Sequence, residues 1–77
     1  MKIKVIVTLK KGVLDPQGKA IQQTLNSMSF DSVSDVRQGK FFEIEVVEQN
    51  ETKAKSLVDD MCKKLLANLV IEDYKIV

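Results

Sequence analysis

The sequence contains no histidine, so it lacks the side chain that most often serves as a general base or as a metal ligand. Its single cysteine, Cys62, has no partner for an intramolecular disulfide. Twelve Lys and Arg residues against eleven Asp and Glu residues leave a formal charge of +1, which gives no long-range field for nucleic acid or an anionic membrane. No continuous apolar run marks a signal peptide or a membrane span. We therefore expect a cytoplasmic protein with no metal site, no nucleic-acid partner and no membrane partner.

The chain is short enough that residues 1–77 are expected to form a single domain. A single core of this size rarely supplies more than about 3–5 kcal/mol of stability. Association with another protein is therefore a reasonable expectation.

The periodicity of the apolar residues predicts four strands and two helices. Residues 2–10 alternate between polar and aliphatic side chains over most of their length, as a half-buried strand does. In the second half of the chain, apolar residues recur at helical spacing at Ala54, Leu57, Val58, Met61 and Leu65. The predicted elements are strands at residues 2–10, 33–37, 41–47 and 70–77, helices at residues 16–28 and 51–67, and a turn at Gln38-Gly39.

The order βαββαβ predicts an α+β protein. The simplest packing is a two-layer sandwich, in which two helices cover one face of an antiparallel four-stranded sheet in a ferredoxin-like arrangement or a close variant. The first strand places Lys2 and Lys4 on its outward face, and the third places Glu43 and Glu45 there. Opposite charges on facing strands stabilise each other, so these two strands are expected to be neighbours. The alternative is that both outward faces are merely solvated.

The start of the first helix is well marked. Asp15 is a favoured N-cap, and Pro16 is favoured at the first helical position. Ile21, Leu25 and Met28 then fall on one apolar stripe of the helix. The sequence therefore predicts an amphipathic helix that begins after Asp15.

Gly18 is a poor helix former in this first turn and costs roughly 1 kcal/mol relative to alanine. Its presence predicts that another segment packs closely against its backbone. The alternative explanation is that the free N–H groups at the start of the helix bind an anion. The candidates for an anion or contact site are Gly12, Asp15, Gln17, Gly18 and Lys19. The glycine spacing does not match a nucleotide phosphate loop.

Apolar residues on the uncovered face of the sheet predict a surface for self-association. Phe41 and Phe42 are consecutive, so one of the two rings must point away from the helices. Ile6, Val47 and Ile71 share the outward parity of their strands. An apolar set on an exposed sheet face usually marks a protein interface, although scattered exposure of single residues is the alternative. The candidates for a homodimer built on the sheet are Ile6, Phe41, Val47 and Ile71.

The predicted turn before the third strand contains Arg37, Gly39 and Lys40, although the fold does not require a basic turn there. Turn residues that a rigid sheet presents are common contact sites, so we expect this turn to touch a larger partner. The alternative is a solvated hairpin in which Gly39 supplies a positive φ.

Five segments that span nearly the whole chain carry a resemblance to a known family: Lys4–Lys10, Gly12–Ala20, Val36–Lys40, Met61–Asn68 and Val70–Tyr74. In their order and spacing they resemble the PurS family, the small non-catalytic subunits of bacterial and archaeal phosphoribosylformylglycinamidine synthase. Two loop positions depart from the family pattern. Leu69 stands where proline is usual, and Ser29 stands where glycine is common.

The resemblance implies a part in the ATP-dependent conversion of formylglycinamide ribonucleotide and glutamine into the amidine. It implies a PurQ-type glutaminase subunit that releases ammonia, a PurL-type synthetase subunit that uses it, and a homodimer or higher oligomer of this chain. ATP and magnesium would bind to the synthetase subunit, and no cofactor would bind to this chain. The chain would have no catalytic residue and would assemble the two larger subunits. Candidates for contact with them are Arg37, Gly39, Lys40 and Asn68.

Two other functions stay open at the level of sequence. Small βαββαβ modules often bind amino acids or metabolites, so a stand-alone ligand-binding regulatory domain is the main alternative. It would hold its ligand at the start of the first helix. A purely structural oligomer is the other alternative.

Overall fold

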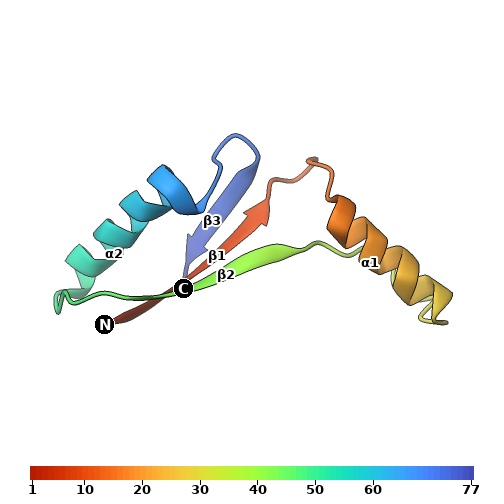
Figure 1. The fold of residues 1–77 in the computed structure, drawn as a ribbon, viewed down its shortest axis with the longest axis horizontal. Coiled ribbons are helices and arrows are strands. Elements are labelled where there is room, and N and C mark those ends of the chain that lie inside the picture. Colours follow the sequence, from red (N-terminus) through yellow and green to blue (C-terminus); the bar gives the residue numbers. More distant parts are fainter.

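The structure is a computed structural model that describes all residues 1–77. Figure 1 shows a small sheet, one helix beside it and a second helix that extends away from it. The α+β class and the antiparallel sheet predicted from the sequence are confirmed. The elements in chain order are β1 (Lys2–Leu9), α1 (Pro16–Ser27), β2 (Gly39–Glu45), α2 (Glu51–Met61), the π-helical turn η1 (Cys62–Leu66) and β3 (Glu72–Ile76).

The central strand is β1, which pairs antiparallel with β2 on one side and with β3 on the other. The predicted pairing of the lysine-rich and glutamate-rich strands is confirmed, because Lys4 lies opposite Glu43 and Lys2 lies opposite Glu45. Lys2 Nζ lies 3.7 Å from a carboxylate oxygen of Glu43. Both side chains are about half exposed, so this ion pair adds little stability and serves chiefly to favour this pairing.

The predicted strand at residues 33–37 does not form, so the sheet has three strands instead of four. The carbonyl groups of this segment accept hydrogen bonds from side chains of α1 instead of from another strand. Gln22 Nε2 donates to Ser34 O over 3.1 Å, and Asn26 Nδ2 donates to Val33 O over 3.1 Å. The segment therefore lines α1.

The boundaries of β2 and β3 also differ from the prediction. Gly39 lies opposite Thr8 and is the first residue of β2, so the predicted turn at Gln38-Gly39 is wrong. No turn is needed there, because β2 continues the extended segment that returns from α1. β3 begins two residues later than predicted because Asn68 orders a turn before it. The Asn68 side chain accepts from Val70 N over 3.1 Å, and Asn68 N donates to Glu72 over 2.6 Å.

The core lies between the sheet and α2. The buried line consists of Ala54 and Val58 of α2 and Cys62 of η1, and the small side chains of Ala54 and Cys62 let the helix lie close to the sheet. Of the predicted apolar stripe, Ala54 and Val58 are buried, whereas Leu57, Met61 and Leu65 are 46%, 38% and 83% exposed. Leu65 lies in η1, whose wider turn ends the α-helical spacing on which that prediction depended. The buried apolar residues are Ile3, Val5, Val7, Val46, Ala54, Val58, Cys62 and Ala67.

Only α2 covers the sheet. α1 projects beyond one end of it, which gives the molecule extents of 49 × 24 × 14 Å (Figure 1). The Cα radius of gyration is 15.9 Å, whereas a compact chain of this length has about 11 Å. The expectation that both helices cover one face of the sheet is therefore wrong for the single chain. Ile21 and Met28 of the predicted apolar stripe are 41% and 60% exposed as a result.

Candidate functional site

The projecting part of the molecule consists of α1 and the segment 28–38 that returns along it, and we call this part the arm. The rest, the sheet with α2 and η1, is the body. The returning segment is tied to α1 by the amide side chains of Gln22 and Asn26 described above. The chain reverses at Ser29, whose φ of 75° is a left-handed conformation that glycine adopts most readily. The arm is thus a hydrogen-bonded unit of helix and extended chain.

The close approach predicted at Gly18 is confirmed. A Cβ atom at Gly18 would clash with the carbonyl oxygen of Val36 in the returning segment. The N–H of Gly18 is also occupied, because it donates to a carboxylate oxygen of Asp15 over 2.9 Å. The start of α1 already holds this carboxylate, so an anion bound there would meet a negative charge.

Asp15 also reaches across to Gln38, the last residue of the returning segment before β2. Its second carboxylate oxygen accepts from the backbone N–H of Gln38 over 2.7 Å, and the residue is only 7% exposed. The hydrogen bonds from Gln38 and then Gly18 lower the pKa of Asp15 below its ordinary value of 3.8. One side chain therefore caps α1 and ties its start to Gln38, the residue directly before β2.

Arg37 makes the second connection at this place. Its guanidinium donates to Val13 O over 2.9 Å and to Lys10 O over 3.2 Å, so it holds the loop between β1 and α1 against the segment before β2. We call these contacts of Asp15 and Arg37 the joint. Sequence reasoning assigned Arg37 to a partner contact and missed its structural part, because no local pattern reveals two carbonyl acceptors so far away in the chain.

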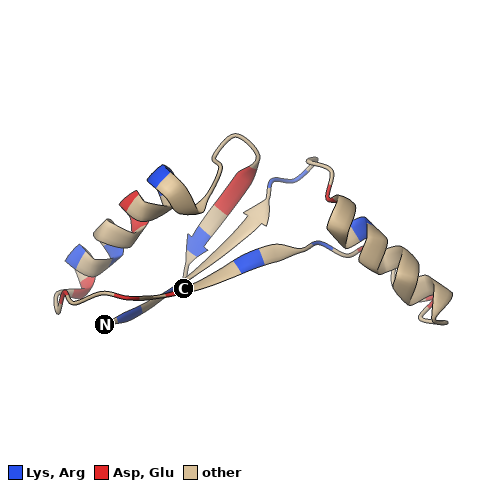
Figure 2. Cartoon of the chain, viewed as in Figure 1, with Lys and Arg blue, Asp and Glu red and all other residues tan.

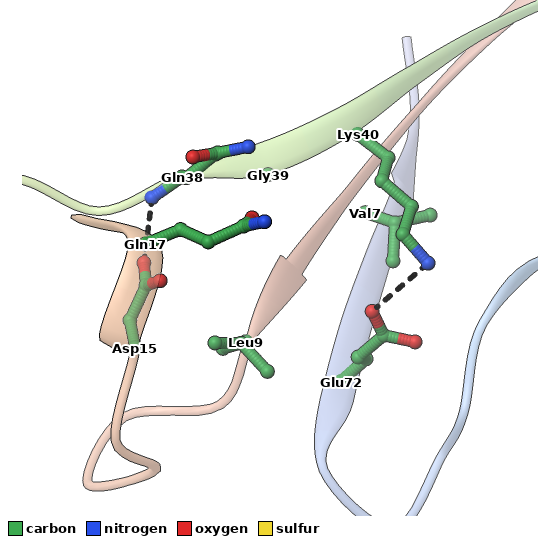
Figure 3. Close-up of a pocket in the computed structure, with 8 residues that line it drawn as sticks. All are labelled: Val7, Leu9, Asp15, Gln17, Gln38, Gly39, Lys40 and Glu72. Carbon is green, nitrogen blue, oxygen red and sulfur yellow. Dashed lines mark hydrogen bonds and ion pairs between the residues drawn. The ribbon is translucent and has the colours of Figure 1, made fainter. Parts of the chain in front are cut away.

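A hollow of about 220 Å³ opens beside the joint, between the start of α1 and the ends of the three strands (Figure 3). Lys40 reaches across β1 toward Glu72, and the Lys40 Nζ lies 3.7 Å from a Glu72 carboxylate oxygen. Lys40 thus lies in β2 rather than in a turn. The hollow is lined by five polar or charged residues and by Val7, Leu9 and Gly39; the polar ones are Asp15, Gln17, Gln38, Lys40 and Glu72.

The remaining candidate residues for an anion site or a partner contact lie in different parts of the structure. Gly39 has no positive φ, contrary to the alternative considered for it, and a Cβ there would lie 2.6 Å from Val7 O. Gly12 does have a positive φ of 90° and sits in the loop between β1 and α1. Lys19 is exposed on α1, and Asn68 orders the turn before β3. These residues do not converge on one site.

The dimer candidates do not form one patch either. Ile6 and Phe41 are register partners on the outward face of the sheet and are 39% and 56% exposed. Phe41 is therefore the outward ring, whereas Phe42 packs against the core. Val47 lies beyond the end of β2, and Ile71 precedes β3 at the opposite end of the sheet.

Sequence reasoning did not anticipate two exposed apolar surfaces. The first is the α1 stripe of Ile21, Leu25 and Met28, in which Ile21 and Met28 are exposed and Leu25 is half-buried. The second is the α2 flank of Leu57, Met61 and Leu65, all exposed to 38% or more. This flank lies on the side of α2 away from β3, because Asp59, on the opposite side of the helix, accepts the hydroxyl hydrogen bond of Tyr74 in β3 over 2.5 Å. One signal was available in the sequence: Lys19 is the only charged residue of α1 (Figure 2).

No group of three or more Cys, Asp or Glu side chains is placed to hold a metal ion. Cys62 is fully buried, and burial raises the pKa of its thiol, with the nearby Asp59 charge adding to the shift. None of the helices has the length and apolar character that crossing a bilayer requires. The features that stand out are the arm, the joint and the two apolar surfaces.

Comparison with known proteins accounts for almost the whole chain. The family model PurS, described as phosphoribosylformylglycinamidine (FGAM) synthase, matches residues 2–77. The PurS subunit of this synthase from Bacillus subtilis is 53% identical over 74 residues, which cover 96% of this chain and 87% of that protein. The PurS subunit from Methanocaldococcus jannaschii is 51% identical over 75 residues, which cover 97% and 90%.

Solved structures agree with these sequence matches. PurS from B. subtilis aligns with a TM-score of 0.87 at 51% identity, covering 99% of this chain and 94% of that one. A chain in the structure of PurLQS from Thermotoga maritima aligns with a TM-score of 0.90 at 33% identity, covering 99% and 93%. The resemblance carried by the five sequence segments is confirmed, and the chain belongs to the PurS family of phosphoribosylformylglycinamidine synthase subunits.

Proposed function

We propose that this chain is the small structural subunit of a phosphoribosylformylglycinamidine synthase in purine biosynthesis. It joins a PurQ-type glutaminase to a PurL-type synthetase so that ammonia passes from one to the other. The observation that carries the proposal is the match over 99% of the chain to a chain of the PurLQS structure. ATP and magnesium belong to the synthetase subunit in this proposal, no cofactor binds to this chain, and the complex is cytoplasmic.

The shape of the chain supports an assembling role. The body has a core of eight buried residues, whereas the arm leaves two residues of its apolar stripe, Ile21 and Met28, exposed in the single chain. Charged residues are depleted from the cores of protein interfaces, and the nearly uncharged α1 has that composition. A surface of this kind is stabilised when another protein covers it.

We assign the α1 stripe to the homodimer. Only α2 covers the sheet within one chain. Phe42 and Ile44 of β2 are therefore only half-buried, and the α2 flank stays exposed. α1 of a second copy would supply the missing cover, and a two-fold axis would make the exchange reciprocal. The earlier candidates Ile6, Phe41, Val47 and Ile71 stay predictions. Among them the adjacent pair Ile6 and Phe41 would form a separate contact on the outward face.

The assay that tests the function compares two nitrogen sources at saturating ATP. With the synthetase and glutaminase present, adding this chain should raise glutamine-dependent synthesis strongly, while synthesis from free ammonia should depend on it less. The physical reason is that holding two sites in register replaces a diffusional encounter with a local one. A glutamine-dependent rate that does not change when the chain is omitted would contradict the proposal. Equal loss of both rates would instead assign the chain to the synthetase site itself.

Lys40 is the residue we propose for contact with the synthetase, because its ammonium group is exposed and its ion pair with Glu72 is long. Lys40→Ala should weaken assembly with the synthetase and leave the thermal melt of the isolated chain nearly unchanged. Lys55→Ala, which removes an exposed lysine of α2 paired with Glu51, is the matched control. Equal assembly by both variants would remove Lys40 from the interface.

The hollow beside the joint favours one alternative, a stand-alone ligand-binding domain. Its polar lining includes the side chains of Gln17, Gln38 and Lys40 (Figure 3). This alternative requires that the isolated chain bind a small molecule there. Calorimetric titration of the isolated chain with glutamine, formylglycinamide ribonucleotide and ATP tests it, and binding that Gln17→Ala abolishes would support it.

A further inference from the structure

The arm and the body are connected at one place only. Two chain segments leave the sheet side by side, one after β1 and one before β2, and α1 does not pack extensively against any strand or against α2. Asp15 and Arg37 hold these two segments together. The angle between arm and body is therefore set at the joint.

The chemistry of both side chains suits this task. A carboxylate has two oxygens, and those of Asp15 accept from Gly18 N in the first turn of α1 and from Gln38 N in the returning segment, one residue before β2 begins. A guanidinium is a planar fork with several donors, and that of Arg37 donates to two carbonyl groups of the facing loop. Hydrogen bonds with one ionised partner are roughly twice as strong as neutral ones.

The length of the arm amplifies any freedom at the joint. α1 has 12 residues, and at 1.5 Å per residue the helix is about 18 Å long. A change of about 10° at the joint would displace the far end of α1 by about 3 Å. Met28 lies at that end, so the α1 stripe keeps one position relative to the body only if the joint is stiff.

We infer that Asp15 and Arg37 are positioning residues, which fix the angle of the arm so that the α1 stripe is presented ready for docking. Preorganisation of this kind improves affinity because less freedom is lost on binding. The inference rests on the proposed function only for the docking step. The stiffness of the joint is a property of the single chain.

Distance measurement between two spin labels tests the stiffness directly. Gln23→Cys places one label on the exposed side of α1 and Ser56→Cys places the other on α2, while the buried Cys62 stays unlabelled. The labelled chain is mixed with excess unlabelled chain, so that only distances within one chain are measured. The parent should give a narrow distribution.

Two variants loosen the joint by different routes. Asp15→Ser keeps a good helix cap but is too short to reach Gln38 N as well, and Arg37→Lys keeps the charge but loses the fork. Asn50→Ser is the matched control, because Asn50 caps α2 by accepting from Lys53 N and bridges to nothing else. Both joint variants should broaden the distance distribution, and Asn50→Ser should leave it narrow. Fluorescence of Tyr74, the single tyrosine, should show an intact body in all three.

The same variants separate positioning from contact. Both joint variants should raise the dissociation constant of the homodimer by about three- to tenfold, although neither changes the α1 stripe. When the concentration of this chain is below saturation, the rate of glutamine-dependent synthesis should fall together with the dimer affinity. The rate should recover when the concentration of the chain is raised. A narrow distribution in both joint variants would overturn the inference, and so would a broad distribution with unchanged dimer affinity. If the parent neither dimerises nor stimulates synthesis, the proposed function fails, and the distance measurement still tests the joint.

Discussion

α1 and α2 are helices of nearly equal length, 12 and 11 residues, and each begins at a side-chain cap, Asp15 or Asn50. They differ in what covers their apolar side. α2 buries Val58 against the sheet, whereas α1 leaves Ile21 and Met28 exposed. They differ also in charge, since α2 carries Glu51, Lys53, Lys55, Asp59 and Asp60 and α1 carries Lys19 alone (Figure 2). A helix whose outer side stays in water is charged there, so the uncharged α1 has the composition of a helix that another molecule covers.

The largest expected effect is the loss of stability caused by a substitution in α2, the helix that packs on the core. Val58→Asp places an unpaired charge where the side chain is fully buried, and this should cost about 3–5 kcal/mol, most of the stability of a domain this size. Circular dichroism should show an unfolded chain at room temperature. Ser56→Asp puts the same charge on the exposed side of the same helix and should melt like the parent. A folded Val58→Asp variant would show that α2 does not hold the body together.

The corresponding change in α1 should leave the chain folded and break its association. Ile21→Glu should raise the dissociation constant of the homodimer by about a hundredfold, as loss of a central interface residue does. The thermal unfolding of the body, followed by the fluorescence of Tyr74, should stay nearly unchanged. Sedimentation equilibrium measures the first and tyrosine fluorescence the second. Leu57→Glu on the α2 flank should weaken the dimer similarly. If Phe41→Glu alone dissociates it, the interface is the outward sheet face and our assignment of α1 is wrong.

Gly18→Ala should have a smaller effect, directed at the packing inside the arm. The added methyl group clashes with Val36 O, so helix and returning segment must separate, at a cost of about 1–3 kcal/mol. Gln23→Ala, at an exposed position of α1, should instead be neutral or slightly stabilising. Hydrogen exchange of the amides of residues 16–38 should speed up in Gly18→Ala alone. Unchanged exchange would mean that the arm tolerates the separation.

The smallest expected effect is a pH dependence that distinguishes the two tethering aspartates from the other carboxylates. The pKa of Asp15 is lowered by Gln38 N–H, and that of Asp59 is lowered first by the Tyr74 hydroxyl and then by Lys63. A carboxylate whose pKa is lowered on folding stabilises the fold fully above its unfolded pKa, and this contribution is lost as the pH falls through the folded pKa. Asp15→Asn and Asp59→Asn should therefore be less stable than the parent at pH 7, and each difference should shrink below about pH 4. Denaturant titrations at several pH values check this, and a constant difference down to pH 2 would contradict it.

The sequence was sufficient where the signal is local. The cap at Asp15 and the close approach at Gly18 follow from a few neighbouring residues, and both are confirmed. The pairing of β1 with β2, which is also confirmed, is remote in the chain, but the opposite charges on the two strands reveal it. The outward position of Phe41 and the inward position of Phe42 were left open, because parity alone does not say which face the helix covers.

Where the sequence failed, the deciding contacts are remote or lie outside the chain. Residues 33–37 were assigned to a strand, yet a side chain of α1 takes the carbonyl group of Val33 as its hydrogen-bond acceptor. An amphipathic stripe shows that a helix is covered, but not which molecule covers it, so α1 was placed on its own sheet. Arg37 has both of its partners in the loop between β1 and α1, 24 and 27 residues away in the chain, and a short motif cannot reveal them.

The pairing of Thr8 with Gly39 shows that β1 and β2 form a β-hairpin and that the whole arm is its loop. The entropic cost of closing a loop grows only with the logarithm of its length, so the hairpin tolerates a long excursion at small expense. Such an insertion can be lengthened, shortened or exchanged during evolution while the strands that flank it stay paired. For the same reason, it should be possible to remove the arm from the protein by design. A two-residue Asn-Gly turn in place of residues 9–38 should leave a body that keeps its sheet and α2 and no longer associates.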